Sequence, residues 1–144
     1  MNIRYEKNIM TGEMLANMRN LAGWGNTSIL KADIAIKNTP FSIAALDDDI
    51  LVGIGRIIGD GALIWYVQDV IVLSEYQGKG IGTEIMNYLI EYAKLNSVPN
   101  ERFTIGLMSA KGKEIFYEKL GFRLRPNENE NEGSGMVITI TGEN

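Results

Sequence analysis

The segment Gln77–Gly82, with the sequence QGKGIG, has a composition suited to holding an anion. It follows an apolar run, Leu63–Leu73, that predicts a buried strand, and it precedes apolar residues at helical spacing, which are Ile81, Ile85, Leu89 and Ala93. Three glycines at alternate positions therefore lie where a strand passes into a helix. The first N–H groups of a helix have no internal partner, and the helix dipole favours negative charge. The segment predicts a phosphate-binding loop, with Lys79 as an added positive charge.

The glycine spacing excludes the two standard nucleotide-binding loops. The dinucleotide fingerprint needs a third glycine three residues after the second, but Ile85 stands three residues after Gly82. The P-loop needs Gly-Lys-Ser/Thr, but Lys79 is followed by Gly80. The loop therefore fits a phosphate ligand of another class, and the simpler alternative is a turn that uses glycine to change direction.

Composition limits the class of protein and the chemistry it can perform. The chain has 144 residues, of which 45% are hydrophobic and 22% charged, which predicts one globular domain over residues 1–144. It has no cysteine and no histidine, which excludes a thiol nucleophile, a Ser-His-Asp triad and a Cys- or His-ligated metal site. Any acid or base must be Asp, Glu, Tyr or Lys, and we expect no metal.

Charge and hydropathy indicate where the protein works. The net charge of −4 argues against a nucleic-acid partner, which normally meets a basic face. No apolar run approaches the roughly 20 residues that span a bilayer, so we expect no membrane association. The first residues lack the apolar core of a signal peptide, so we expect a cytoplasmic protein.

The elements that must position the glycine loop follow from hydrophobic periodicity and turn residues. We predict strands at Ile3–Glu6, Phe41–Leu46, Ile50–Ile58, Ala62–Leu73 and Phe103–Met108, and a last strand pair at Phe122–Arg125 and Met136–Thr141. We predict helices after an N-cap at Thr11, over about Ser28–Lys37, over about Gly80–Leu95, and from Ser109 or Ala110 to a C-cap at Gly121. Short turns predict an antiparallel meander, and the strand after the crossover helix runs parallel to its neighbour.

The element order and two motifs together resemble the GNAT superfamily of acyl-CoA-dependent N-acyltransferases. The family signature Gln/Arg-x-x-Gly-x-Gly/Ala is matched by Gln77, Gly80 and Gly82, and a second marker, Tyr-Glu-Lys-x-Gly-Phe, stands at Tyr117–Phe122. The resemblance covers nearly the whole chain, although the first forty residues match only in outline. It implies an α+β fold with a mixed, mostly antiparallel sheet of about seven strands, flanking helices, and a splay between the fourth and fifth strands.

The resemblance implies that acetyl-CoA is the cosubstrate. Main-chain N–H groups of the loop would bind its pyrophosphate, and the residues concerned are Gln77, Gly78, Lys79, Gly80, Ile81, Gly82 and Thr83. Main-chain groups of Ile71, Val72 and Leu73 would pair with the pantetheine arm as an added strand does. The Lys79 side chain either contacts phosphate or is a solvated surface lysine.

Two residues are candidates for proton transfer. Asp69 interrupts an apolar strand, where burial would raise its pKa and poise it to accept a proton; the alternative is a structural aspartate bonded to nearby groups. Strand alternation predicts Tyr66 and Gln68 on the opposite face, where other relatives place their base. By resemblance Tyr117 donates a proton to the departing CoA thiolate, although a flanking tyrosine is ordinarily an amphipathic boundary residue. Many relatives carry an Asn seven residues earlier, where this chain has Ala110, so that cofactor contact is absent or is supplied by Ser109.

The acceptor side of the site is less recognisable. Trp24 is either a core tryptophan between two helices or a wall of the acceptor pocket that the resemblance implies. Arg56 interrupts an apolar strand, which indicates a binding site or an ion pair. The loop at 127–132, rich in Asn and Glu, is either a solvated turn or an edge of the acceptor site.

The sequence thus predicts an N-acetyltransferase in which an amine attacks the acetyl thioester directly, since no cysteine is present to carry the acetyl group. A small-molecule amine is the favoured acceptor, with a protein amine as the alternative, and a homodimer is left open. The competing hypothesis is a non-catalytic acyl-CoA-binding sensor or regulatory module with the same fold.

Overall fold

The computed structural model describes residues 1–126 and 131–143, which form two compact units, Met1–Met108 and Ser109–Asn144. The first unit contains a five-stranded sheet with the strands in sequential order. They are β1 (Ile3–Lys7), β2 (Phe41–Asp47), β3 (Ile50–Gly59), β4 (Ile64–Val72) and β5 (Thr104–Gly106). The first four strands are antiparallel neighbours and β5 runs parallel to β4, which confirms the predicted meander and the parallel crossover.

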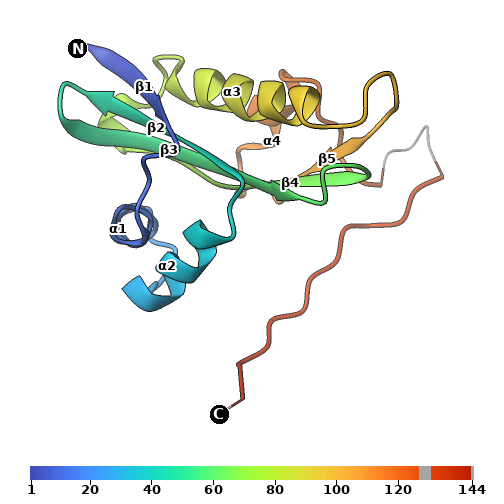
Figure 1. The fold of residues 1–144 in the computed structure, drawn as a ribbon, viewed down its shortest axis with the longest axis horizontal. Coiled ribbons are helices and arrows are strands. Elements are labelled where there is room, and N and C mark those ends of the chain that lie inside the picture. Colours follow the sequence, from blue (N-terminus) through green and yellow to red (C-terminus); the bar gives the residue numbers. More distant parts are fainter. Residues whose placement is uncertain (127–130, 144) are drawn as a thin grey trace. The chain divides into compact units, whose positions relative to one another are not determined.

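Helices cover both faces of this sheet (Figure 1). Helices α1 (Gly12–Leu21) and α2 (Ile29–Lys37) lie against one face, and α3 (Ile81–Leu95) lies across the other. The predicted cap at Thr11 is present, since its Oγ1 accepts from the Met14 N–H at 3.1 Å, and Ser28 caps α2 in the same way, its Oγ accepting from the Lys31 N–H at 3.1 Å. Each hydroxyl satisfies one of the N–H groups that the first helical turn leaves without a partner.

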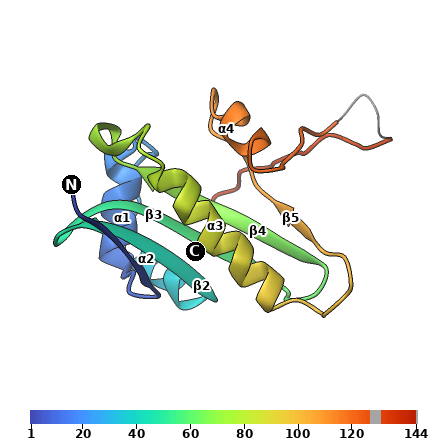
Figure 2. The same ribbon diagram turned by 90° about the horizontal axis from the view of Figure 1, so that it is seen from above.

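The packing of α3 depends on two glycines of β3. The helix crosses β2, β3 and β4 (Figure 2), and its buried stripe consists of Ile81, Ile85, Met86, Leu89 and Ala93. Gly53 and Gly55 lie beneath this stripe and let the helix approach the sheet. A Cβ atom at Gly55 would lie only 2.5 Å from Cγ2 of Ile85 and 3.2 Å from Cδ1 of Leu89.

Strands β4 and β5 are paired over only three residues. The pairing ends at Tyr66 and Gly106, whereas β4 continues for six further residues to Val72. Within Met1–Met108, the edge of β4 beyond Tyr66 therefore has β3 on one side and no paired strand on the other. The end of this pairing is where the splay between the fourth and fifth strands implied by the resemblance would begin.

The second unit contains one short helix, α4 (Glu114–Glu118), in its described part. The prediction of a helix from Ser109 or Ala110 is wrong, because Gly112 has a φ of 89°, which a right-handed helix does not accommodate. The predicted end at Gly121 is confirmed. The Phe122 N–H donates to the Tyr117 carbonyl at 3.1 Å and the Gly121 N–H donates to the Glu118 carbonyl at 3.0 Å, with Gly121 at a φ of 101°. This is a Schellman cap.

The predicted last strand pair, Phe122–Arg125 with Met136–Thr141, is wrong, since neither segment is a strand. The described residues thus form five strands rather than about seven. The prediction relied on β propensity, which does not by itself supply a hydrogen-bonded neighbour. Residues 127–130 of the predicted link, which include most of the loop at 127–132, lie outside the described residues. The segments before and after residues 127–130 are joined by a hydrogen bond in which Nε of Arg125 donates to the Gly133 carbonyl at 3.0 Å.

Substitution of Gly55 by alanine tests the close approach of α3. We expect Gly55→Ala to lower the free energy of unfolding by about 1–3 kcal/mol, because the new methyl group overlaps a branched side chain that is fully buried. Urea denaturation measures the change. The matched control is Gly106→Ala in β5, where the nearest atom to the added Cβ is 4.0 Å away. Equal stability of the two variants would contradict this account of the packing.

Candidate functional site

A bulge in β4 sets the geometry of the candidate site. Arg56 pairs with Gln68 and Ile54 pairs with Ile71, so Gly55 alone on β3 lies opposite two residues of β4, Asp69 and Val70. Asp69 is the inserted residue and adopts a φ of 57°. Left-handed backbone is rare outside glycine, and aspartate is among the residues that tolerate it best. The local sequence therefore allows the bulge at this position.

The bulge corrects the predicted orientation of Gln68 and Tyr66. We expected both on the face opposite Asp69, but Gln68 and Asp69 line the same cavity. The inserted residue interrupts strict alternation, so two consecutive side chains point to the α1–α2 face. Tyr66 is two residues before Gln68 and shares its face. Burial raises the pKa of Tyr66, and the Asp69 carboxylate adds to the rise.

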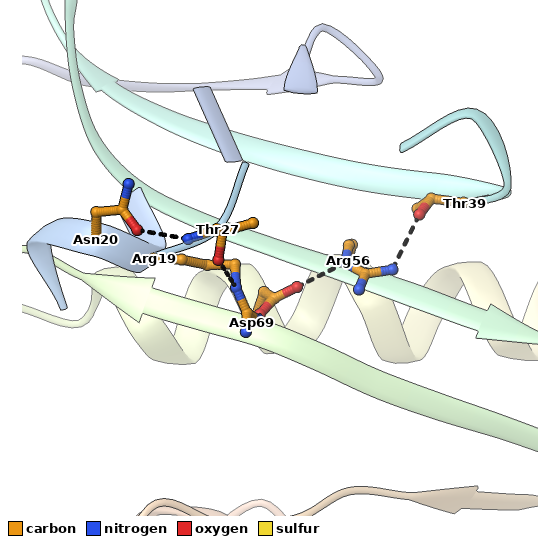
Figure 3. Close-up of polar contacts among 6 residues, drawn as sticks. All are labelled: Arg19, Asn20, Thr27, Thr39, Arg56 and Asp69. Carbon is orange, nitrogen blue, oxygen red and sulfur yellow. Dashed lines mark hydrogen bonds and ion pairs between the residues drawn. The ribbon is translucent and has the colours of Figure 1, made fainter. Parts of the chain in front are cut away.

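The Asp69 side chain is fully buried and is held by two arginines from different elements (Figure 3). Oδ2 accepts from Nε of Arg56 on β3 at 2.7 Å, and Oδ1 accepts from Nη1 of Arg19 on α1. The arginine side chains are 12% and 24% exposed, respectively. The ion pair predicted as one alternative for Arg56 is thus present, and both oxygens of Asp69 are engaged.

The two arginines have further partners that fix their orientation. Nε of Arg19 donates to Oγ1 of Thr27 at 2.9 Å, and Nη1 of Arg56 donates to Oγ1 of Thr39 at 3.2 Å (Figure 3). The Thr27 N–H in turn donates to Oδ1 of Asn20 at 3.0 Å. The network therefore joins α1, β3, β4 and the segments that flank α2.

A cavity of about 220 Å³ opens over this network. It is lined by side chains from α1, α2, β3, β4 and the link between the helices, which are Leu15, Arg19, Thr27, Lys31, Ala32, Ala35, Arg56, Gln68 and Asp69. Its apolar wall comes from the helices, and its floor is the polar surface of the two strands. A small polar molecule with an apolar segment fits such a lining.

The glycine loop presents main-chain donors. Gly78 and Gly80 have φ values of 75° and 85°, and Gly80 is the N-cap residue of α3. In the described part of the chain, the N–H groups from Gly78 to Thr83 form no hydrogen bond outside α3, and a helix offers its first turn no acceptor. A Cβ atom at Gly78 or Gly80 would meet nothing within 4 Å, so the approach to the main chain at these two glycines is open. This geometry suits an anion.

Gln77 joins the glycine loop to the open edge of β4. Its Nε2 donates to the Val72 carbonyl at 2.9 Å. The Leu73 N–H donates to the Val52 carbonyl on β3, so by strand alternation the main chain of Val72 points to the opposite side, away from β3. Of the three residues predicted to pair with a ligand, Ile71, Val72 and Leu73, only Val72 directs its N–H outward.

The Lys79 side chain lies over the Tyr76 ring. Its ammonium group lies 6.0 Å from the centre of the Tyr76 ring and borders an open groove that also contains Asp47 and Glu75. The Tyr76 hydroxyl donates to Oδ2 of Asp47 at 2.7 Å. The positive charge of Lys79 is therefore shared with a surface that already contains two carboxylates.

Tyr117 lies on α4 in the second unit. Its ring contacts Phe116 and Phe122 edge-on, at centroid distances of 4.9 and 6.0 Å. Burial raises the pKa of its phenol, which therefore keeps its proton at neutral pH. Gly121, Phe122 and the ring of Tyr117 belong to the helix cap, since a contact between Phe122 and Tyr117 accompanies a Schellman motif. The cap explains neither the Tyr117 hydroxyl nor the side chains of Glu118 and Lys119.

Trp24 lies beside Arg19 at the protein surface. Trp24 is 40% exposed, so it is not a core tryptophan, and its ring lies 5.6 Å from the Arg19 guanidinium carbon. Trp24 does not line the cavity. Sequence reasoning missed Arg19, although a signal existed. Arg19 follows Leu15 by four residues and so places a charge on the apolar stripe of α1.

The described residues contain neither a metal-binding cluster nor a membrane-spanning helix. No three or more of their His, Cys, Asp or Glu side chains are arranged to hold a metal ion. None of the helices in the described ranges is long and apolar enough to cross a bilayer.

Comparison with known proteins identifies relatives along most of the chain. The chain is similar to an uncharacterized N-acetyltransferase, ycf52, of Pyropia yezoensis, with 29% identity over 125 residues, which is 84% of this chain and 69% of that protein. It is also 29% identical over 111 residues to a ycf52-like N-acetyltransferase of Prochlorococcus marinus, of which it spans 59%.

Solved structures and a family model agree with these relatives. The structure of SA2161 from meticillin-resistant Staphylococcus aureus, a probable acetyltransferase, matches with a TM-score of 0.82 and 29% identity, over 96% of this chain and 99% of that one. The GNAT-family acetyltransferase SP0256 from Streptococcus pneumoniae matches with a TM-score of 0.77 and 26% identity, over 97% and 99%. The model of the acetyltransferase (GNAT) domain matches residues 19–138. This chain therefore belongs to the GNAT acetyltransferase family.

Proposed function

We propose that the chain is an acetyl-CoA-dependent N-acetyltransferase that transfers the acetyl group to an amine by direct attack. The observation that carries the proposal is the outward N–H of Val72 on the edge of β4, connected through Gln77 to a loop whose N–H groups have no partner outside α3 among the described residues. Family membership supports the acetyl donor. On this proposal residues 1–144 form one acetyltransferase domain that works in the cytoplasm on a small-molecule amine.

The residues present fit acetyl-CoA. The N–H donors of the glycine loop, open at Gly78 and Gly80, suit its pyrophosphate, and the edge of β4 beyond Tyr66 suits an extended pantetheine arm. When bound, acetyl-CoA would supply the acetyl group of its thioester to the amine and leave as the CoA thiol. The outward N–H of Val72 would donate to the thioester carbonyl oxygen and stabilise the negative charge that develops there.

Asp69 has two proposed roles, and its geometry favours the second. As predicted from sequence, it would accept the amine proton directly or through water. Its engaged oxygens argue instead for a positioning role, because protonation would leave two guanidinium groups facing a neutral acid. We propose that Asp69 positions Arg19 and Arg56, and that water in the cavity accepts the proton.

A substitution inside the first turn of α3 tests the anion site. Gly80 is unsuitable because its φ of 85° strains any side chain, so we choose Gly82→Glu at the second helical position. A carboxylate there is favoured by the helix dipole, and the loss of glycine stabilises the helix by several tenths of a kcal/mol. We expect unchanged or higher thermal stability with acetyl-CoA affinity reduced by about tenfold or more, measured by calorimetric titration.

Asn87→Glu is the control for Gly82→Glu, because it adds the same charge to an exposed position of α3 beyond the first turn. This variant should bind acetyl-CoA as the wild type does. Normal affinity in a folded Gly82→Glu variant would show that the loop does not hold the cofactor.

Removal of one oxygen tests Tyr117 as the proton donor. Tyr117→Phe keeps the ring between Phe116 and Phe122, so we expect stability and acetyl-CoA affinity to change little. Turnover should fall by about 100-fold, the lower range for loss of a general acid. The control Tyr88→Phe, on α3, should leave turnover unchanged. Wild-type turnover in Tyr117→Phe would remove the proposed role.

The pH dependence supplies a second test of Tyr117. Because burial raises its pKa above the ordinary value of about 10, the phenol stays protonated through pH 7–9. Loss of turnover through deprotonation of Tyr117 should therefore begin only above about pH 10, and Tyr117→Phe should lack that alkaline limb. An alkaline limb that persists in the variant would assign it to another group.

Neutralisation of Asp69 distinguishes its two roles. If Asp69 positions the arginines, Asp69→Asn should lower the free energy of unfolding by about 3 kcal/mol, since two buried cations lose their counter-charge. The double variant Asp69→Asn/Arg56→Gln should then lose less stability than the two single losses combined. Asp49→Asn, in an exposed turn, serves as the control. Wild-type stability with loss of turnover would instead support the proton-acceptor role.

An amine panel assayed for thiol release tests the function as a whole. Release of free CoA with some amines, and not without them, is expected of an acetyltransferase. Binding of acetyl-CoA without release for any small amine or lysine peptide would favour the non-catalytic sensor.

A further inference from the structure

The cavity on the α1–α2 face has the opposite charge to the chain as a whole. The chain has a net charge of −4, yet three cationic side chains line the cavity against one carboxylate. The cations are Arg19, Lys31 and Arg56, and the carboxylate is Asp69. Because Asp69 neutralises only one of them, the cavity retains an excess of positive charge that must be met by water, ions or a ligand.

Each of the three cations has N–H donors that no described residue accepts from. Arg19 and Arg56 each use Nε and Nη1 for Asp69 and a threonine, and their Nη2 groups have no hydrogen-bond partner in the part of the chain that the structure describes. The Lys31 ammonium likewise forms no ion pair with any described residue, and Lys31 lies one turn into α2 at the cavity wall. A guanidinium has five N–H donors in a fixed fork, which suits a carboxylate or phosphate group.

The two guanidinium groups are also held in place before any ligand binds. Asp69, Thr27 and Thr39 fix their planes, and each arginine is largely buried. Donors that are already oriented lose little conformational entropy on binding, so they favour an anion more than mobile surface lysines do. Leu15, Ala32 and Ala35 supply an apolar wall beside them, suited to a short carbon chain.

We infer that the acceptor amine bears an anionic group, a carboxylate or a phosphate, which Arg19, Arg56 and Lys31 bind in this cavity. The inference rests on the proposed function and specifies its acceptor. The cavity volume of about 220 Å³ corresponds to roughly seven water molecules, so the part of the acceptor held there is small. The anionic group contacts the arginines, and a short spacer directs the amine toward the open end of β4.

Matched acceptor pairs test the inference. One set is ω-amino acids of increasing length against their amides, which keep the amine and remove the negative charge. The other set is amino-sugar phosphates against the unphosphorylated amino sugars. We expect at least one anionic acceptor to exceed its neutral partner by about tenfold or more in kcat/KM, as charge-assisted hydrogen bonds imply. The set that shows the preference identifies the anion as carboxylate or phosphate.

Lys31→Gln supplies the variant arm, because Lys31 is exposed and contributes no ion pair to the described structure. It should raise the KM for the anionic acceptor about threefold to fivefold, as loss of an exposed ion pair does, and leave the KM for acetyl-CoA and the neutral amine unchanged. Lys37→Gln at the far end of α2 is the control, since Lys37 does not line the cavity. A rise in the KM for acetyl-CoA instead would mean that the cations serve the donor.

Direct binding separates failure of this inference from failure of the proposed function. The N-acetylated ω-amino acids and amino-sugar phosphates, and their neutral counterparts, are titrated calorimetrically into the wild type and Lys31→Gln without acetyl-CoA. Tighter binding of an anionic form, weakened in the variant, supports the inference even if no thiol is released. Equal binding and equal turnover of charged and neutral partners overturn it, whereas an enzyme that acetylates only neutral amines overturns the inference and leaves the proposed function intact.

Discussion

The buried charge of Asp69 is the constraint on which the rest of the acceptor side depends. One inserted residue in β4 places this carboxylate between Arg56 of β3 and Arg19 of α1, and it reverses the facing of the residues around it. Before the insertion Trp65 packs against Tyr92 of α3, whereas after it Ile71 joins the cluster of α1 residues that includes Leu15 and Met18. A bulge bends its strand, and the pairing with β5 has ended by this point. The inserted residue therefore accounts for both the burial of the charge and the orientation of the arginines.

A carboxylate buried between two cations often contributes less to the free energy of folding than apolar side chains of the same size would. The network instead specifies an arrangement. It fixes where α1 and the α1–α2 link lie on the sheet, through Thr27, and it reaches the end of α2 through Thr39. A protein with an acidic composition thereby keeps an excess of cationic side chains around one small cavity.

Sequence reasoning succeeded where the signal was local. Thr11 and Ser28 mark helix starts by side-chain chemistry, and the stripe through Ile85 and Leu89 follows helical period. It failed where the outcome depended on a distant neighbour. The facing of Gln68 changes because Gly55 on another strand lies opposite two residues, which β4 alone does not reveal. The β-prone segment Met136–Thr141 forms no strand, because β propensity alone does not supply a neighbouring strand to hydrogen-bond with. The predicted helix end at Gly121 is confirmed, and its cap leaves the Tyr117 hydroxyl and the side chains of Glu118 and Lys119 without a role.

The contact between Gln77 and the Val72 carbonyl has a consequence for the length of the donor. It fastens the loop of anion donors to the strand edge five residues earlier, so the span between the Gly80 region and the Val72 N–H is fixed by the protein. The distance between the two binding positions would then have to match the distance between the diphosphate and the thioester carbonyl of the donor. In a donor with a longer or shorter arm, the carbonyl would miss the Val72 N–H when the diphosphate is bound at the loop. Discrimination among acyl donors would thus begin with the length of the pantetheine arm, before the size of the acyl group is met.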